Sequence, residues 1–119
     1  EGIYYQPTVI ANCKQDMRII QEEIFGPVLP LVEFEDLDQA IEYANDSDYG
    51  LTSSIFTNNL KTALKACNEI RFGETMINRD NMEIFQSFHA GLRKSGIGGA
   101  DGKHGLYEYM QTHAVYMRA

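Results

Sequence analysis

The sequence has few positive charges, and this shortage excludes one class of partner. Ten lysines and arginines stand against 17 aspartates and glutamates, so the formal net charge is −7, and positive charges cluster only at Arg93-Lys94. A surface of this charge repels a phosphate backbone. We therefore expect no nucleic-acid partner.

Long apolar runs and cysteine pairs are also lacking. No apolar stretch approaches the length of about 18 residues that a membrane-spanning helix needs, and no charged-then-apolar leader precedes a cleavage site. We expect a cytoplasmic protein with no membrane partner. Cys13 and Cys67 are too few for a disulfide scaffold, and no spacing of Cys and His resembles a zinc site. Both are expected to be reduced thiols, with no metal bound.

The chain does contain enough apolar residues for a folded core. Its 119 residues and 44% hydrophobic content are typical of one globular domain or part of one. Glu1 is followed at once by the strand-like residues 3–5, without a capping or leader segment. We therefore expect an excised piece of a larger protein.

Periodicity predicts alternating strands and helices. Strands are expected at residues 8–10 and 28–34, with one helical turn at 16–20 between them. The run 28–34 is nearly continuous in apolar character, as in a strand buried on both faces, although Pro30 favours a bend or an edge. Asp36 is then the expected N-cap of a helix whose face is Leu37, Ala40, Ile41 and Ala44.

The pattern repeats in the middle of the chain. A strand is expected at residues 52–57, followed by a helix that Asn58-Asn59 can cap and that Gly73 can end in a left-handed conformation. Its predicted apolar face consists of Leu60, Ala63, Leu64, Cys67 and Ile70. A third strand is expected at 75–78. This order predicts an α/β fold with a parallel βαβαβ unit joined by right-handed crossovers.

The remaining residues are less regular. Five glycines accumulate in an irregular stretch at residues 79–103, which does not follow the strand–turn–helix order of a dinucleotide fingerprint and is therefore interpreted as a structural loop. A short helix is expected at 105–111 and a final strand at 113–118. Residues 1–111 are accordingly treated as one structural region and 112–119 as a terminal strand.

Several motifs resemble the aldehyde dehydrogenase superfamily. Residues 21–28 are similar to its Glu-x-Phe-Gly-Pro motif, and residues 45–51, 73–78 and 94–98 follow at family spacing. Within the superfamily, residues 88–91 and 95–102 look most like the lactaldehyde and glycolaldehyde dehydrogenases. Most relatives have Arg-Glu where this chain has Gly99-Ala100. The resemblance implies that residues 1–111 are part of the catalytic domain, from its C-terminal end, and that residues 112–119 form an oligomerisation strand.

The resemblance also implies a reaction. In this family a cysteine thiolate attacks the aldehyde, hydride passes to NAD, and a glutamate-activated water hydrolyses the thioester. The nucleophile, the base and most of the dinucleotide fold lie upstream of the motif at 21–28, as do the residues that distinguish NAD from NADP. Cys13 and Cys67 match no nucleophile motif and are interpreted as buried structural thiols. We therefore expect no catalytic residue in this chain and no turnover by it alone.

Two residues are implied to bind the cofactor. Glu23 matches the glutamate whose carboxylate accepts hydrogen bonds from both hydroxyls of the nicotinamide ribose, and Phe25 matches the aromatic beside the nicotinamide. The alternatives are a solvated carboxylate, as Glu22 is expected to be, and an ordinary core phenylalanine. Gly26-Pro27 is expected to shape the turn that aims Glu23 and Phe25.

Two further residues are candidates for substrate binding. Glu83 and His89 occupy positions where many relatives place aromatic residues lining the aldehyde tunnel. A carboxylate and an imidazole can hydrogen-bond the hydroxyl of a small 2-hydroxyaldehyde, whereas an alkyl chain would leave them partly unsatisfied. The alternatives are a solvated loop residue and a structural histidine.

The resemblance finally implies a homo-oligomer, usually a tetramer, in which the last strand joins a neighbouring subunit's sheet. Three tyrosines near that strand are expected in packing or subunit contacts: Tyr107, Tyr109 and Tyr116. The predicted function is thus that of an NAD-dependent enzyme oxidising a small hydroxyaldehyde. A semialdehyde dehydrogenase, or a non-catalytic folding or interaction module, remains the alternative.

Overall fold

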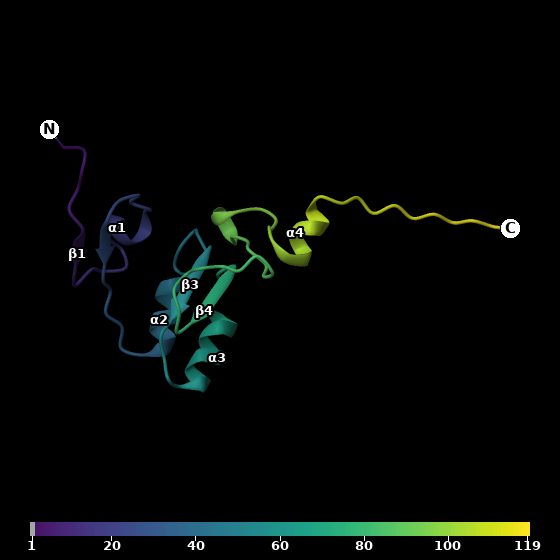
Figure 1. Ribbon diagram of the computed structural model, residues 1–119. Coiled ribbons are helices and arrows are strands. Elements are labelled where there is room, and N and C mark those ends of the chain that lie inside the picture. Colours follow the sequence, from purple (N-terminus) through teal and green to yellow (C-terminus); the bar gives the residue numbers. More distant parts are fainter. Residues whose placement is uncertain (1) are drawn as a thin grey trace. The chain divides into compact units, whose positions relative to one another are not determined.

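The chain consists of two compact units, described separately. The computed structural model describes residues 2–119 (Figure 1). The units divide after Ser47. Each unit contains one pair of parallel strands. The predicted α/β class is therefore confirmed. No helix in residues 2–119 is long and apolar enough to cross a membrane.

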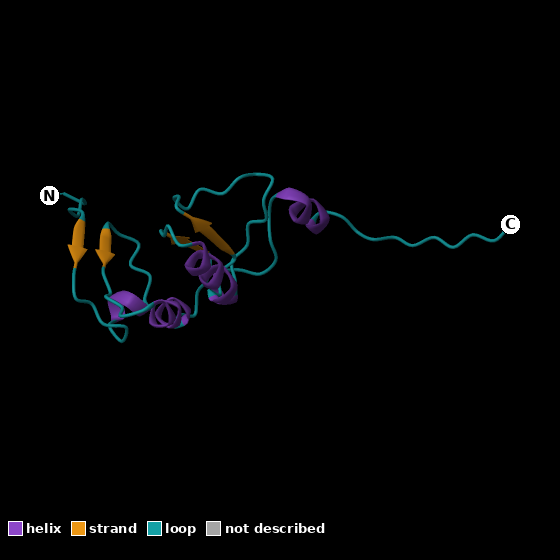
Figure 2. Ribbon diagram, turned by 90° about the horizontal axis from the view of Figure 1, so that it is seen from below, coloured by secondary structure: helices purple, strands orange, loops and turns teal. Residues whose placement is uncertain are grey.

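The first unit contains β1 (Thr8–Ile10), α1 (Arg18–Gln21), β2 (Val28–Pro30) and α2 (Leu37–Asn45). The strands β1 and β2 run side by side in the same direction, as Figure 2 shows, with Thr8 opposite Val28. The strand β2 ends at Pro30, four residues earlier than predicted, because proline has no N–H to continue a ladder. Burial on both faces was also a wrong expectation, since Leu29 is 58% exposed.

The helix α2 begins where the sequence predicted. The Asp36 side chain accepts a hydrogen bond from the Gln39 backbone N–H at 2.9 Å, which confirms it as the N-cap. The predicted apolar face is also inward, with Ile41 buried and Ala40 and Ala44 half-buried. Local capping and periodicity thus suffice to place this helix.

The second unit is built on a strand–helix–strand motif. It comprises β3 (Thr52–Ile55), α3 (Leu60–Glu69) and β4 (Glu74–Ile77), with β3 and β4 parallel. Asn59 caps α3 as predicted, its side-chain oxygen accepting from the N–H groups of Lys61 and Thr62. The strands β2 and β3 lie in different sheets. The predicted βαβαβ order is therefore present as two parallel pairs and not as one sheet within the described residues.

The buried face of α3 differs from the predicted one. Ala63 and Ala66 are buried, whereas Leu60 is 72% and Leu64 55% exposed. The helix has an apolar stripe, but within the described chain only its alanines are covered. Cys67 is exposed, so its assignment as a buried structural thiol was wrong. Cys13, the other free cysteine, is buried as predicted.

Gly73 is required for a different reason from the one predicted. The helix α3 ends at Glu69 with Ile70 as its extended C-cap residue, and Gly73 is not left-handed. A β-carbon at Gly73 would lie only 1.5 Å from the carbonyl oxygen of Ala90. The glycine therefore permits a close approach of two backbone segments.

The C-terminal region contains η1 (Arg93–Ser95) and α4 (Gly102–Glu108). The helix α4 begins three residues before the predicted start. Residues 110–119 extend beyond α4 without strand pairing in the described chain (Figure 1). The terminal strand thus stays a prediction. All three tyrosines are exposed in the described chain, and their role in packing or subunit contacts stays a prediction.

Candidate functional site

Glu23 and Phe25 lie in the loop between α1 and β2, and both are exposed. Phe25 is 91% exposed and has a φ of 49°. A bulky residue with positive φ is strained, and such strain concentrates at functional sites. The turn continues with a hydrogen bond from the Val28 N–H to the Gly26 carbonyl at 2.8 Å. The left-handed conformation in this turn is adopted by Phe25 and not by Gly26, and the Phe25 ring is left exposed to solvent.

The neighbouring carboxylate of Glu22 has a different environment. Both its oxygens accept hydrogen bonds from the Arg18 guanidinium at 2.8 Å, one helical turn earlier. This hydrogen bonding lowers the pKa of Glu22 and raises that of Arg18. Glu22 is thus an exposed carboxylate that belongs to a surface ion pair, which distinguishes it from Glu23.

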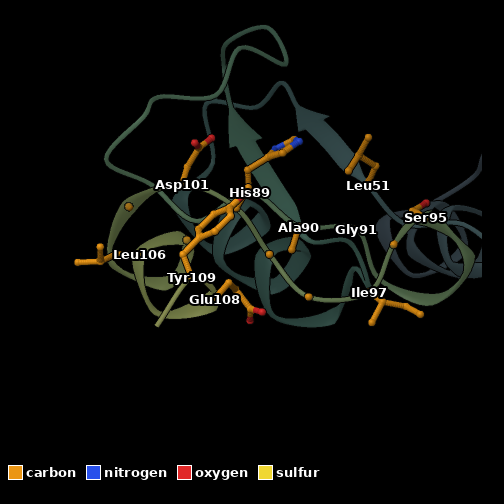
Figure 3. Close-up of a pocket in the computed structure, with 16 residues that line it drawn as sticks. Leu51, His89, Ala90, Gly91, Ser95, Ile97, Asp101, Leu106, Glu108 and Tyr109 are labelled. Atoms are coloured by element: carbon orange, nitrogen blue, oxygen red, sulfur yellow. The ribbon is translucent and has the colours of Figure 1, made fainter. Parts of the chain in front are cut away.

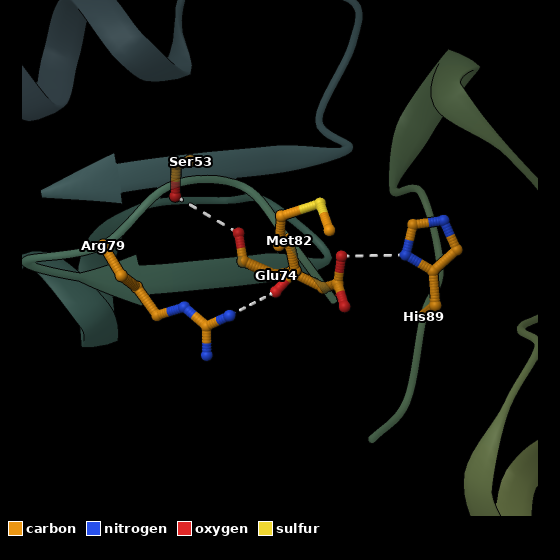
Figure 4. Close-up of polar contacts among 5 residues, drawn as sticks. All are labelled: Ser53, Glu74, Arg79, Met82 and His89. Atoms are coloured by element: carbon orange, nitrogen blue, oxygen red, sulfur yellow. Dashed lines mark hydrogen bonds and ion pairs between the residues drawn. The ribbon is translucent and has the colours of Figure 1, made fainter. Parts of the chain in front are cut away.

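His89 is held by a buried carboxylate that the sequence analysis missed. Its Nδ1 lies 2.8 Å from Oε2 of Glu74, the first residue of β4 (Figure 4). The Glu74 side chain is only 8% exposed, whereas that of His89 is 31% exposed. Strands disfavour glutamate, so a glutamate at the start of a strand that continues Thr75-Met76-Ile77 was the available signal.

The backbone around this pair is fixed on both sides. The N–H of Glu74 donates to the Leu51 carbonyl at 3.1 Å, and its carbonyl accepts from the Ser53 hydroxyl at 3.2 Å (Figure 4). His89 exchanges two backbone hydrogen bonds with Ala100, at 3.0 and 2.7 Å. The contact of Gly73 with Ala90 brings the two segments together. The main chain therefore determines that Glu74 and His89 lie side by side.

The charges around His89 are acidic. The hydrogen bond with Glu74 is the largest cause that raises the pKa of His89 above its ordinary value. Desolvation opposes it as the second-largest cause, and the charges of Glu74, Glu83 and Asp101 each raise the pKa by less. Each of these groups is a carboxylate. The imidazole therefore takes a proton more readily than a free histidine does.

Glu83 and His89 line different cavities. Glu83 lines a cavity of about 380 Å³ beside β4, which Glu74 also lines. His89 and Asp101 line a second cavity of about 810 Å³, between the glycine-containing segment 95–102 and α4 (Figure 3). Glu74 connects the two, since it lines the first cavity and binds the histidine of the second.

Comparison with known proteins identifies the family. The pattern that defines the aldehyde dehydrogenase family matches residues 1–115. This chain belongs to the aldehyde dehydrogenase family. It is 61% identical over 119 residues to lactaldehyde dehydrogenase of Escherichia coli strain K12, covering all of this chain and 25% of that protein. The chain thus spans about a quarter of the length of the curated relatives it matches.

Solved structures show the same fold. The crystal structure of lactaldehyde dehydrogenase from Escherichia coli matches with a TM-score of 0.94 and 62% identity, over 98% of this chain and 24% of that one. A betaine aldehyde dehydrogenase from Staphylococcus aureus, in complex with NAD⁺, matches with a TM-score of 0.87 and 42% identity, over 91% and 21%. The fold of this aldehyde dehydrogenase chain is therefore one that solved structures of the family share.

The cysteines of this aldehyde dehydrogenase chain lie apart from the candidate residues. Cys13 is buried after β1, where its thiol donates to the Ile10 carbonyl at 3.4 Å. Cys67 is exposed on α3. Neither lines the cavities that contain Glu83 and His89.

Proposed function

We propose that this chain is part of an NAD-dependent aldehyde dehydrogenase that oxidises a small hydroxyaldehyde, of the lactaldehyde or glycolaldehyde type, to its acid. The observation that carries the proposal is the 61% identity to lactaldehyde dehydrogenase along the whole chain. The geometry adds a partly exposed imidazole, fixed by hydrogen bonds, at a cavity lined also by carboxylates.

The substrate's hydroxyl is the group that these residues suit. An imidazole and a carboxylate can each hydrogen-bond a hydroxyl, and both would lose hydrogen bonds on burial against an alkyl chain. His89 supplies the imidazole and Glu83 the carboxylate. The two residues line separate cavities, and we propose that each contacts a different side of the substrate.

The exposed residues of the loop after α1 suit the cofactor. Glu23 presents a carboxylate that can accept from both hydroxyls of a ribose, and Phe25 presents an exposed ring face that can limit the motion of a flat heterocycle. When bound, NAD supplies the hydride acceptor of the reaction. The role of Glu23 and Phe25 is to bind and orient it.

The chain contributes to the enzyme without performing the chemistry. Cys67 is on α3, Cys13 is buried, and the family's nucleophile and base belong to the upstream part of the protein. We therefore expect no aldehyde oxidation by the 119-residue chain alone. The exposed residues 112–119 are proposed to pair with a neighbouring subunit's sheet in a homo-oligomer, with a tetramer the arrangement expected from the family.

The proposal is tested by making the substrate pocket apolar. In the full-length enzyme, Glu83→Phe combined with His89→Phe removes the hydrogen-bond partners of the hydroxyl. The kcat/KM for lactaldehyde or glycolaldehyde should fall by roughly 10² or more, because a site built around a hydroxyl discriminates strongly. Propanal, which lacks the hydroxyl, should be affected far less.

The diagnostic quantity is the ratio of the two specificity constants. A misfolded or displaced loop would depress both constants together, whereas loss of hydroxyl recognition changes their ratio. An unchanged ratio in a well-folded double variant would show that Glu83 and His89 do not recognise the hydroxyl, and the substrate proposal would fail.

A further inference from the structure

Glu74 is a buried carboxylate that the proposed function has not yet used. It opens β4, its side chain is 8% exposed, and its Oε2 lies 2.8 Å from Nδ1 of His89. A buried carboxylate is costly unless its charge is compensated, so its position demands a partner. In the described structure that partner is the imidazole of His89.

The chemistry of the contact determines which ring nitrogen remains available. An ionised carboxylate can only accept hydrogen bonds, so Nδ1 of His89 must carry the hydrogen that joins them. Nε2 is on the side of the ring that faces away from Glu74 (Figure 4). In the neutral imidazole Nε2 is an acceptor, and in the imidazolium it is a donor.

Both partners are held before any ligand arrives. The main chain of Glu74 is fixed by its hydrogen bonds to Leu51 and Ser53, and that of His89 by two hydrogen bonds to Ala100. The two side chains are held by their contact with each other. A site whose groups are already oriented loses less conformational entropy on binding. The histidine ring can therefore be presented in one orientation.

We propose that Glu74 is a positioning residue that fixes the ring orientation and the Nδ1-protonated form of His89, so that Nε2 is directed to the substrate hydroxyl. This inference rests on the proposed function. Glu74 acts through His89 and does not itself contact the substrate.

The groups that face His89 set the expected pH behaviour. They are Glu74 from β4, Glu83 from the loop after β4, and Asp101 immediately before α4, all of them acidic. Their carboxylates raise the pKa of the His89 imidazole, the hydrogen bond with Glu74 being the largest cause. Neutralising Glu74 should therefore lower the pKa of His89.

The experiment compares Glu74→Gln, His89→Gln and the double variant in the full-length enzyme. Glutamine keeps the size of glutamate but removes its charge. Glu74→Gln should lower the ratio of kcat/KM for lactaldehyde to that for propanal by roughly tenfold, the lower end of the loss seen when the partner of a metal-binding histidine is removed. Adding Glu74→Gln to His89→Gln should lower the ratio no further, because Glu74 acts only through the histidine.

A spectroscopic readout separates positioning from general stability. With ¹⁵N-labelled histidine, NMR should show His89 in the Nδ1-protonated form above its titration, and Glu74→Gln should lower its pKa. The resonance that disappears from the spectrum of His89→Gln is thereby assigned to His89. Glu42→Gln, which neutralises an exposed carboxylate on α2, is the matched control and should change neither the ratio nor the His89 signal.

The outcomes separate the inference from the function on which it rests. If His89→Gln leaves the substrate ratio unchanged, the proposed function fails and the inference with it. If His89→Gln lowers the ratio but Glu74→Gln changes neither the ratio nor the His89 pKa, only the inference is overturned. If Glu74→Gln does not fold, the wild-type spectrum decides alone, since a neutral His89 protonated on Nε2 contradicts the proposal.

Discussion

The carbonyl oxygen of Ala90 lies 1.5 Å from the position that a β-carbon on Gly73 would occupy. This contact brings the backbone before β4 against the segment that carries His89. Because Glu74 follows Gly73 and His89 precedes Ala90, the same contact places the carboxylate beside the imidazole. The glycine is thus a structural requirement of the candidate substrate site.

Gly73→Ala should destabilise the protein and disrupt the site together. The added methyl group cannot be accommodated against backbone, so we expect a loss of about 3 kcal/mol in the free energy of unfolding, at the upper end of the usual cost of overpacking. The melting temperature of the full-length protein measures the effect. Gly96→Ala is the control, because its β-carbon would find its nearest neighbour at 3.6 Å. Equal stability of the two variants would contradict the prediction.

The ion pair of His89 and Glu74 should stabilise the protein in a pH-dependent way. The folded-state pKa of His89 is raised above the unfolded value of about 6.5, chiefly by the hydrogen bond with Glu74. Its stabilisation is therefore fully present below about pH 6.5 and is lost as the pH rises through the raised folded-state pKa.

Melting temperatures across this pH range, compared between the wild type and His89→Gln, measure the effect. The series should run from about pH 6 to about pH 9, which includes the usual pKa of histidine. The excess of the wild-type melting temperature over that of His89→Gln should be largest at the acidic end and should decrease as the pH rises. Glu42→Gln, at an exposed carboxylate on α2, serves as the control. A melting-temperature difference that increased with pH would contradict the prediction.

Glu23→Gln should impair use of the cofactor. The substitution removes a charge-assisted acceptor for the ribose hydroxyls, so we expect a loss of roughly 1–3 kcal/mol, seen in the hydride-transfer rate or the KM for NAD. Glu22→Gln is the matched control, since Glu22 is adjacent but bound to Arg18. Unchanged kinetics for Glu23→Gln would remove Glu23 from the cofactor site.

The sequence by itself determined the features that depend on neighbouring residues. Asp36 and Asn59 were predicted as helix caps because a cap needs only the N–H groups of the next two or three residues. The parallel strands followed from the alternation of strand and helix, because a parallel pair requires a crossover between its strands. The motif at 21–28 indicated the family, since its residues are adjacent in the sequence and need no tertiary contact to be recognised.

Only the tertiary structure decided which distant residues meet. Glu74 and His89 are 15 residues apart, and no local pattern links them, because their contact depends on how closely the backbones at Gly73 and Ala90 approach. The burial of Leu60 and Leu64 was mispredicted for a related reason. An apolar stripe shows which face of a helix can be covered, but the layer packed against it determines which side chains are removed from water.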